Sequence, residues 1–289
     1  MTDYRLNRLH AHRLQSEIPP TIVAFLSGKG GVGKSILSFN TAAAMARKGL
    51  RCLLIDLDWY FGNIHLLANI GPNKTIRHIL DSERPEKAIT ALEPNLDLIA
   101  SAAVENPAPE FNPEYFSRLA GSIGSLFHGY EYIILDTASG MPELITPVAL
   151  AADFPIVVLN PELTSIADSY GLFKHLRHSG CRRDISIFVN QADSGMDCEY
   201  IYQKFTAISR EFLDTVPLLA GYLLDDKYVI DSVARQRAIV DLYPNSSTHA
   251  QFLKLLKYLT KGGPRESRKL KTTKKTSINS KTTLADIKE

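Results

Sequence analysis

The sequence has few cysteines and no long apolar run. Its three cysteines, Cys52, Cys181 and Cys198, are far apart and form no CxxC pair, which argues against a disulfide framework and against a cysteine-ligated metal site. No apolar stretch approaches the roughly 20 residues that a membrane-spanning helix needs, and the N-terminus lacks the apolar core of a signal peptide. We therefore expect a cytoplasmic protein, and 45% hydrophobic residues in a chain of 289 are enough for a large core.

Charged residues are unevenly distributed along the chain. The formal net charge is +2, but residues 261–289 carry nine Lys or Arg against three Asp or Glu. The rest of the chain, with 24 Lys or Arg and 28 Asp or Glu, is mildly acidic. The same C-terminal residues are rich in Lys, Thr and Ser and have very few apolar side chains, a composition that predicts a basic, disordered tail. Its charge favours weak contact with an anionic membrane surface or with nucleic acid.

A glycine-rich loop lies between an apolar run at residues 21–26 and a helix-forming segment at residues 36–46. The loop reads Ser27-Gly-Lys-Gly-Gly-Val-Gly-Lys-Ser35. Strand, glycine loop and helix in this order form a phosphate-binding site, because consecutive backbone N–H groups and the helix N-terminus face the phosphate oxygens. In such a loop Lys34 reaches the β- and γ-phosphates and the Ser35 hydroxyl ligates Mg²⁺. We expect nucleotide contacts from Gly28, Lys29, Gly30, Gly31, Val32, Gly33, Lys34, Ser35 and Ile36.

Carboxylates end two further apolar runs. Residues 51–58 are typical of a buried strand that ends in Asp56 and Asp58, and residues 130–136 of one that ends in Asp136. Ligands of parallel α/β sheets bind outside the carboxyl ends of the strands, so we expect these acids beside the glycine loop. Asp136 is then placed to hold Mg²⁺ near Ser35, usually through water.

The remaining segments continue an alternation of strands and helices. The last helix carries four apolar residues on one face, which we interpret as facing the core and not a membrane. We predict one α/β domain over residues 21–260, with a single doubly wound, mostly parallel sheet and helices on both faces. Residues 1–20 form an extension, for which a basic amphipathic helix and a disordered leader both remain open. Further strands are predicted at 96–100, 154–159, 185–190 and 218–222. Helices are predicted at 116–127 and from a cap at Thr164 or Ser165 to His178. The last helix is predicted at 247–260, and its apolar face consists of Phe252, Leu255, Leu256 and Leu259.

The glycine loop resembles that of the MinD/ParA group of deviant Walker A ATPases, because Lys29 turns it into Lys-Gly-Gly-x-Gly-Lys-Ser. Residues 221–229, with Tyr243-Pro-Asn-Ser246, are most similar to the FlhG/FleN-type regulators of flagellar number. The resemblance extends over roughly residues 20–260. Three other segments occur in the order of that family, namely Asp56-x-Asp58, Asp136-Thr-Ala-Ser-Gly140 and Asn160-Pro-Glu162.

The resemblance implies a P-loop ATPase that uses ATP and Mg²⁺ and turns over slowly. It implies a homodimer in the ATP-bound state, in which Lys29 reaches the phosphates of the partner, and it gives Asp58 the role of orienting the attacking water. Metal ligation is then shared by Ser35, Asp56 and Asp136. The resemblance further implies that the change between dimer and monomer acts as a switch. This switch controls the placement or number of a cellular structure, for which the resemblance favours flagella, through a protein partner of the flagellar or polar machinery. We expect it in the cytoplasm or peripherally at the inner membrane.

Other functions fit parts of the same sequence. Asn190-Gln-Ala-Asp193 resembles the Asn-Lys-x-Asp guanine signature, which leaves a GTPase open and adds Asn190 to the expected nucleotide contacts. A division-site ATPase or a DNA- or cargo-partitioning ATPase would share these motifs. Cluster-carrying enzymes of this fold need paired or dimer-facing cysteines, which the sequence lacks. A scaffold that does not hydrolyse nucleotide is disfavoured because both carboxylates are present.

Overall fold

The fold is organised around one eight-stranded sheet. We describe it from a computed structural model, which describes residues 19–81, 84–101, 119, 121–124 and 126–260. The strand order is β3-β4-β2-β5-β1-β6-β7-β8. All neighbouring strands are parallel except β3 and β4, which confirms the predicted mostly parallel sheet. The strands are β1 (Thr21–Ser27), β2 (Cys52–Leu57), β3 (Ile89–Glu93), β4 (Leu96–Ile99), β5 (Tyr132–Ser139), β6 (Phe154–Leu159), β7 (Ser186–Ala192) and β8 (Leu218–Leu224).

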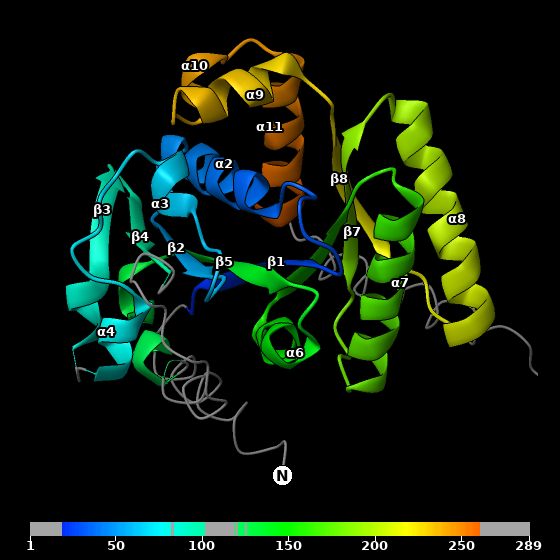
Figure 1. Cartoon of the computed structure of the whole chain (residues 1–289), viewed down its shortest axis with the longest axis horizontal. Coiled ribbons are helices and arrows are strands. Elements are labelled where there is room, and N and C mark those ends of the chain that lie inside the picture. Colours follow the sequence, from blue (N-terminus) through cyan, green and yellow to red (C-terminus); the bar gives the residue numbers. More distant parts are fainter. Residues whose placement is uncertain (1–18, 82–83, 102–118, 120, 125, 261–289) are drawn as a thin grey trace, which may run out of the picture.

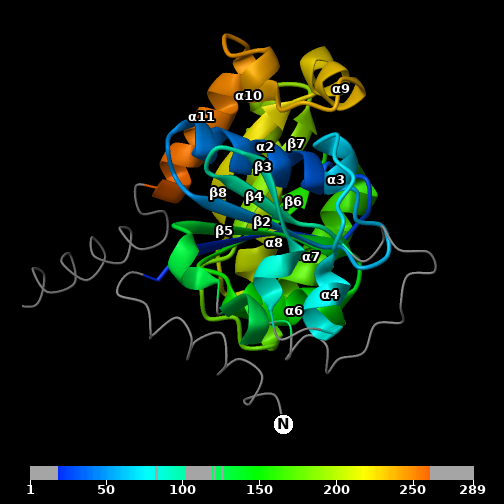
Figure 2. The same cartoon turned by 90° about the vertical axis from the view of Figure 1, so that its left-hand side faces the viewer.

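Helices cover both faces of this sheet (Figure 1). The side view in Figure 2 shows the same two layers with the strands between them. One face carries α2 (Lys34–Arg47), α3 (Ile64–Leu67), α9 (Lys227–Ala234), α10 (Ile239–Leu242) and α11 (Ser247–Thr260). The other face carries α4 (Ile76–Asp81), α6 (Pro142–Ala151), α7 (Leu163–His178) and α8 (Gly195–Leu213), with single 3₁₀ turns at Pro85–Ala88 and Phe127–Gly129.

Two hydrophobic cores result from the alternation of side chains along the strands. In β1, Ile22, Ala24 and Leu26 face the core under α6 and α7, whereas Val23 and Phe25 face the core under α2 and α11. The apolar face of α11 is buried in the second core, so the core-facing interpretation of that helix is confirmed. Its buried side chains include Phe252, Leu255, Leu256 and Leu259.

Two local expectations differ from the structure. Strand β3 was not expected; it forms an antiparallel hairpin with β4 through Asn95, whose φ of 67° makes the tight turn possible. The helix that ends at His178 begins at Leu163 after Glu162, so neither Thr164 nor Ser165 is its cap. Their hydroxyls are used elsewhere, because Ser165 accepts the backbone N–H of Asn160 at 3.1 Å and Thr164 accepts from a lysine.

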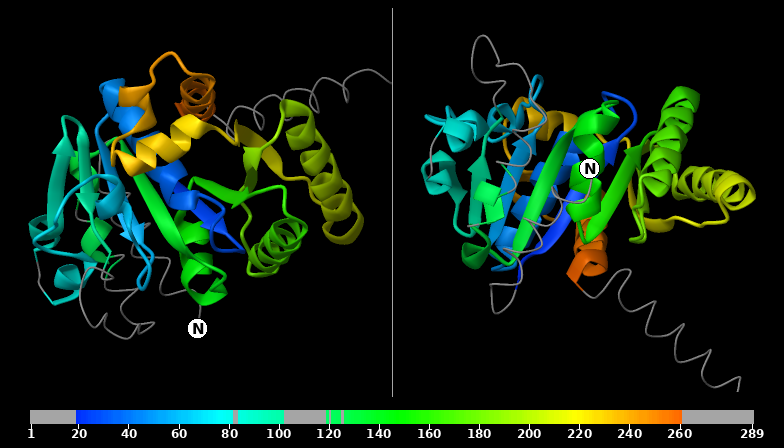
Figure 3. Two further views of the ribbon diagram at one scale, coloured as in Figure 1. Left: turned by 45° about the horizontal axis from the view of Figure 1, so that its top comes forward. Right: turned by 90° about the horizontal axis from the view of Figure 1, so that it is seen from below.

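Helix α2 is held to the segment around α10 along its length, and the left panel of Figure 3 shows these segments next to one another. The Asn40 carboxamide oxygen accepts the Ile239 N–H at 2.7 Å. At the end of the helix, Arg47 pairs with Asp241 at 2.7 Å and with Glu93 of β3. These contacts join α2 to two elements that lie far from it in the sequence.

Several expectations lie outside the described residues. These are most of the extension before β1, part of the expected helix at 116–127, whose described residues 119 and 121–124 are helical, and the basic tail from residue 261 onward. Within the described part of the chain, none of the helices combines the length and apolar character needed to cross a membrane.

Candidate nucleotide-binding site

A cavity of about 610 Å³ opens at the carboxyl ends of β1, β2 and β5. This is the place where open parallel sheets bind ligands, and the volume is within the range of ligand pockets. Its wall combines the glycine loop with the segment after β2, the end of β5 and one residue of α9. The lining residues are Gly30, Gly31, Val32, Gly33, Lys34, Ser35, Ile36, Asp58, Phe61, Asn63, Leu67, Ala138, Ser139, Met141 and Val233.

The backbone of the glycine loop is shaped for an anion. Gly31 and Gly33 have φ values of 79° and 82°, which disfavour other residues. Gly33 is the N-terminal cap of α2, and no side chain of the described chain bonds to that cap. The first N–H groups of α2 therefore stay available to a ligand.

Asn190 supports this loop from behind. Its amide nitrogen donates to the Val32 carbonyl at 2.8 Å, and a methyl group on Gly33 would overlap the same nitrogen. Asn190 is buried and does not line the cavity. Through this hydrogen bond, Asn190 joins β7 to the glycine loop. The resemblance to the guanine signature did not suggest such a supporting role.

Lys34, Ser35 and Asp136 come together at the floor of the cavity. The Ser35 hydroxyl donates to Asp136 Oδ2 at 2.5 Å, and Lys34 is buried next to them. Burial raises the pKa of Asp136 above its ordinary value, while the nearby Lys34 ammonium lowers it. Asp136 Oδ1 is buried and has no partner among the described residues. A carboxylate oxygen in need of a partner beside a serine hydroxyl is a donor set that fits Mg²⁺.

The two aspartates of β2 have different environments. Asp56 is fully buried opposite Asp136 in the sheet register, and its oxygens accept the N–H groups of Asp58 and Ile64 at 3.1 and 3.2 Å. Burial and the neighbouring Asp136 raise the pKa of Asp56 well above its ordinary value. Asp58 lines the cavity and accepts the Phe61 N–H at 3.1 Å. The structure thus brings Asp58 to the cavity and keeps Asp56 behind its wall.

Lys29 lies outside the cavity. Its ammonium group pairs with Glu162 at the start of α7 and donates to Thr164 Oγ1 at 2.8 Å. The pair lowers the pKa of the exposed Glu162 carboxyl. Gly28 allows this arrangement, because any Cβ at this position would overlap the backbone of Asp168 in α7. Neither Gly28 nor Lys29 is among the lining residues.

Comparison with known proteins identifies the group to which this site belongs. A family model described as an AAA domain matches residues 20–179, which is more than half of the chain. The chain belongs to the MinD/ParA family of ATPases. It is 26% identical to the antiactivator FleN of Pseudomonas aeruginosa over 81% of this chain and 84% of that protein. It is 24% identical to the flagellum site-determining protein YlxH of Helicobacter pylori, over 75% and 74%.

The fold of this MinD/ParA chain agrees with solved relatives. Septum site-determining protein MinD of Pyrococcus horikoshii, complexed with Mg-ADP, matches with a TM-score of 0.66 and 22% identity, over 84% of this chain and 96% of that one. The likeness supports the P-loop ATPase fold that the resemblance implied.

Several cavity residues of the MinD/ParA chain were not predicted. Phe61 lies shortly after the carboxyl end of β2, and Met141 shortly after that of β5. Because ligand sites of parallel sheets form at these strand ends, both residues could have been predicted. Val233 reaches the cavity from α9, about 200 residues after the loop, and sequence spacing contains no signal for this contact.

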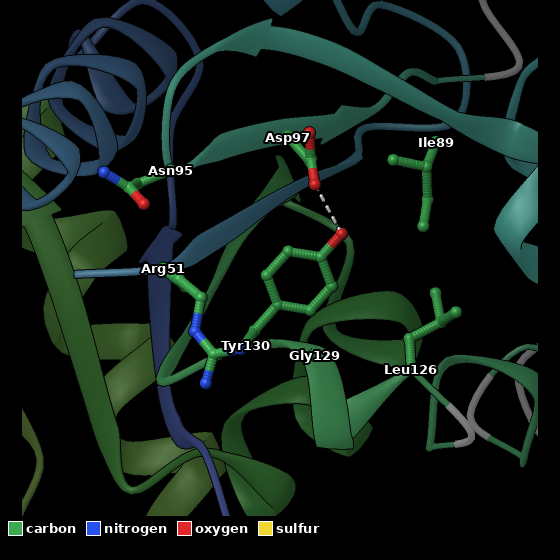
Figure 4. A pocket seen from close by; sticks show the side chains of 7 residues that line it. All are labelled: Arg51, Ile89, Asn95, Asp97, Leu126, Gly129 and Tyr130. Carbon is green, nitrogen blue, oxygen red and sulfur yellow. Dashed lines mark hydrogen bonds between the residues drawn. The ribbon is translucent and has the colours of Figure 1, made fainter. Parts of the chain in front are cut away.

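A second cavity of about 490 Å³ lies near the start of β2 and β4 (Figure 4). Among its polar lining residues, the Tyr130 hydroxyl donates to Asp97 at 2.7 Å, and Arg51 lies 3.9 Å from Glu131, which is not a lining residue. Burial and the bond to Asp97 raise the pKa of Tyr130. Gly129 is the only glycine among the described lining residues, so this cavity offers no phosphate cradle.

Proposed function

We propose that this MinD/ParA ATPase binds and hydrolyses Mg-ATP, forms a homodimer with ATP and returns to a monomer after hydrolysis. The observation that carries the proposal is the different placement of the two loop lysines. Lys34 is buried in the cavity, where a bound nucleotide meets it, whereas Lys29 lies outside on an exposed carboxylate. A lysine in that position is available to the phosphates of a second molecule.

The residues of the cavity divide the work of phosphoryl transfer, which depends mainly on positioning and charge neutralisation. The loop N–H groups and Lys34 hold the phosphates, and Ser35 and Asp136 hold Mg²⁺, which neutralises phosphate charge when bound. Asp58 orients the attacking water from the cavity wall. Asp56 fixes the turn that carries Asp58 through its two backbone hydrogen bonds, and its own ligation of the metal stays a prediction.

Exposed apolar side chains near the cavity support the dimer. Phe61 and Met141 line the cavity and are 76% and 36% exposed, and Leu163, next to Glu162, is 82% exposed. Large apolar groups in such positions are frequent where a partner binds. A second copy bound over the cavity would cover them together with the nucleotide.

The cellular role that we propose is control of flagellar number or placement, through a protein partner of the flagellar or polar machinery. The proposal is supported by the likeness to FleN and YlxH along three quarters or more of this chain. The ATP-bound dimer would present the surface that this partner recognises. We further propose that the basic tail gives weak peripheral contact with the inner membrane.

The experiment combines light scattering with phosphate release, using ATP, ADP and GTP. The wild type should self-associate with ATP and not with ADP, and release phosphate slowly. Lys29→Ala should still bind ATP but stay monomeric, because it leaves Lys34 in place. Equal competition by GTP for a labelled ATP analogue would favour the GTPase alternative. A wild type that stays monomeric with ATP at high protein concentration would contradict the dimer.

A further inference from the structure

The turn that carries Asp58 is bonded internally. The Asp58 carbonyl accepts the Gly62 N–H at 2.9 Å, and Asp58 Oδ1 accepts the Phe61 N–H at 3.1 Å. Both donors belong to the turn itself, so these bonds fix its shape but not its place beside the sheet. The turn can therefore move as one body unless groups outside it hold it.

Two side chains outside the turn hold Asp58, one at its amide and one at its carbonyl. Asp56 of β2 accepts the Asp58 N–H at 3.1 Å, and the Ser101 hydroxyl donates to the Asp58 carbonyl. Ser101 is fully buried and follows β4, the strand that pairs with β2. The chain at this point is itself fixed, because the carbonyl of the neighbouring Ala100 accepts the Ile76 N–H of α4 at 2.8 Å.

Ser101 and Asp56 also meet the turn at Gly62. A Cβ at this position would lie 2.4 Å from the Ser101 Cβ and 2.5 and 2.6 Å from the carboxylate oxygens of Asp56. Glycine is therefore required for close approach, because any larger residue would push the turn away from both side chains. The turn is packed directly against the two groups that hold it.

We propose that Ser101 is a positioning residue, which holds the Asp58 carboxylate in place for hydrolysis through the Asp58 carbonyl. The proposal rests on the proposed function, in which Asp58 orients the attacking water. Without the Ser101 hydroxyl, the turn keeps its internal bonds and its contacts with Asp56, so it pivots about Asp56 and does not unfold. The Asp58 carboxylate then moves away from the place where it orients water.

Phosphate release at saturating ATP and affinity for a labelled ATP analogue together test this role. Ser101→Ala should lower phosphate release about tenfold, because a small displacement of a group that orients the reactant slows the chemical step. Affinity should change less than about twofold, since Ser101 is not among the described residues that line the cavity. Ser101→Cys, which replaces the hydroxyl by a weak donor of similar size, should separate release from affinity in the same way.

Ser186→Ala is the matched control. Ser186 is also fully buried, and its hydroxyl shares a hydrogen bond of 2.8 Å with Tyr258 at the start of β7, away from the cavity. This variant should lose similar stability without changing phosphate release. If Ser101→Ala releases phosphate as Ser186→Ala does, or loses release and ATP affinity to the same extent, the positioning role is wrong.

Trp59 reports the position of the turn without hydrolysis. It is the only tryptophan of the sequence, directly follows Asp58 and is 3% exposed. In nucleotide-free protein, Ser101→Ala should raise acrylamide quenching of Trp59 and amide exchange within residues 59–62, whereas Ser186→Ala should change neither.

These two signals separate the inference from the proposed function. If they rise in Ser101→Ala while the variant and the wild type release phosphate equally, Ser101 holds the turn and the role given to Asp58 in the proposed function is wrong. If the signals stay unchanged while the wild type hydrolyses ATP, the proposed function stands and Ser101 does not hold the turn.

Discussion

Substitution of Gly33 should disturb the glycine loop more than substitution of Gly31, although the two glycines have nearly the same φ. Alanine in the left-handed region costs about 1–2 kcal/mol at either position. At Gly31 nothing lies within 4 Å of an added methyl group, so Gly31→Ala should cost this strain alone. At Gly33 the methyl group overlaps the Asn190 amide and displaces its buried 2.8 Å bond to Val32, which adds about 1 kcal/mol.

These free energies translate into measurable differences in thermal unfolding. For a domain of this size 1 kcal/mol shifts the midpoint by about 2–4 °C, so Gly31→Ala should lower it by about 2–8 °C and Gly33→Ala by about 4–12 °C. Affinity for a labelled ATP analogue should fall in the same order, because the loop N–H groups lose their alignment.

A double-mutant cycle tests the structural reason. In an Asn190→Ala background the overlap is gone, so Gly33→Ala should cost no more than Gly31→Ala does. If Gly33→Ala costs the same in both backgrounds, Asn190 does not support the loop and the reasoning is wrong.

Four other variants test the remaining assignments. Lys34→Ala should abolish nucleotide binding because it removes the buried ammonium from the cavity, and near-normal affinity in a titration would contradict the assignment of the loop. Asp58→Ala should bind ATP, self-associate and release phosphate only near background; an unstable or monomeric variant would indicate a structural role. Glu162→Gln should increase ATP-driven association, most strongly at low salt, because it removes the negative charge that pairs with Lys29. Association equal to that of the wild type would show that this ion pair does not restrain Lys29. Deletion of residues 262–289 should abolish weak, salt-sensitive binding to anionic vesicles or DNA, while ATPase activity is retained. The binding should be weak because each basic residue contributes only about 1 kcal/mol near such a surface. Binding of the full chain that resists high salt would contradict an electrostatic role of the tail.

Much of the fold could be predicted because its signals are local. Buried parallel strands appear as short apolar runs, and the apolar face of α11 follows the helical period, so both were found from the sequence. Strand β3 was missed because Ile89–Glu93 is short, mixed in polarity and follows directly on a 3₁₀ turn. The cap of α7 was misplaced because a serine or threonine in a first turn can bond outside its own helix, as Ser165 does with Asn160.

The residues of the candidate site also comprise some that local sequence signals predict and some that depend on contacts between distant segments. Lys34, Ser35, Asp58 and Asp136 could be predicted because strand ends and a glycine loop determine where they lie. The support of the loop by Asn190 depends on contact across 158 residues of chain, and the pairing of Lys29 with Glu162 across 133. Spacing within a motif contains no information about such contacts, which only the packing of β7 and α7 against the loop creates.

Helix α2 has a mechanical consequence that follows from its two ends. Its first residue, Lys34, lines the cavity, and its last residue, Arg47, pairs with Asp241 and Glu93. Fourteen helical residues make a stiff rod about 20 Å long, so we expect a shift of the glycine loop to be transmitted to the ion pairs of Arg47. Because α9 precedes α10 in the chain and contributes Val233 to the cavity wall, we expect such a shift to act on the wall of the same cavity.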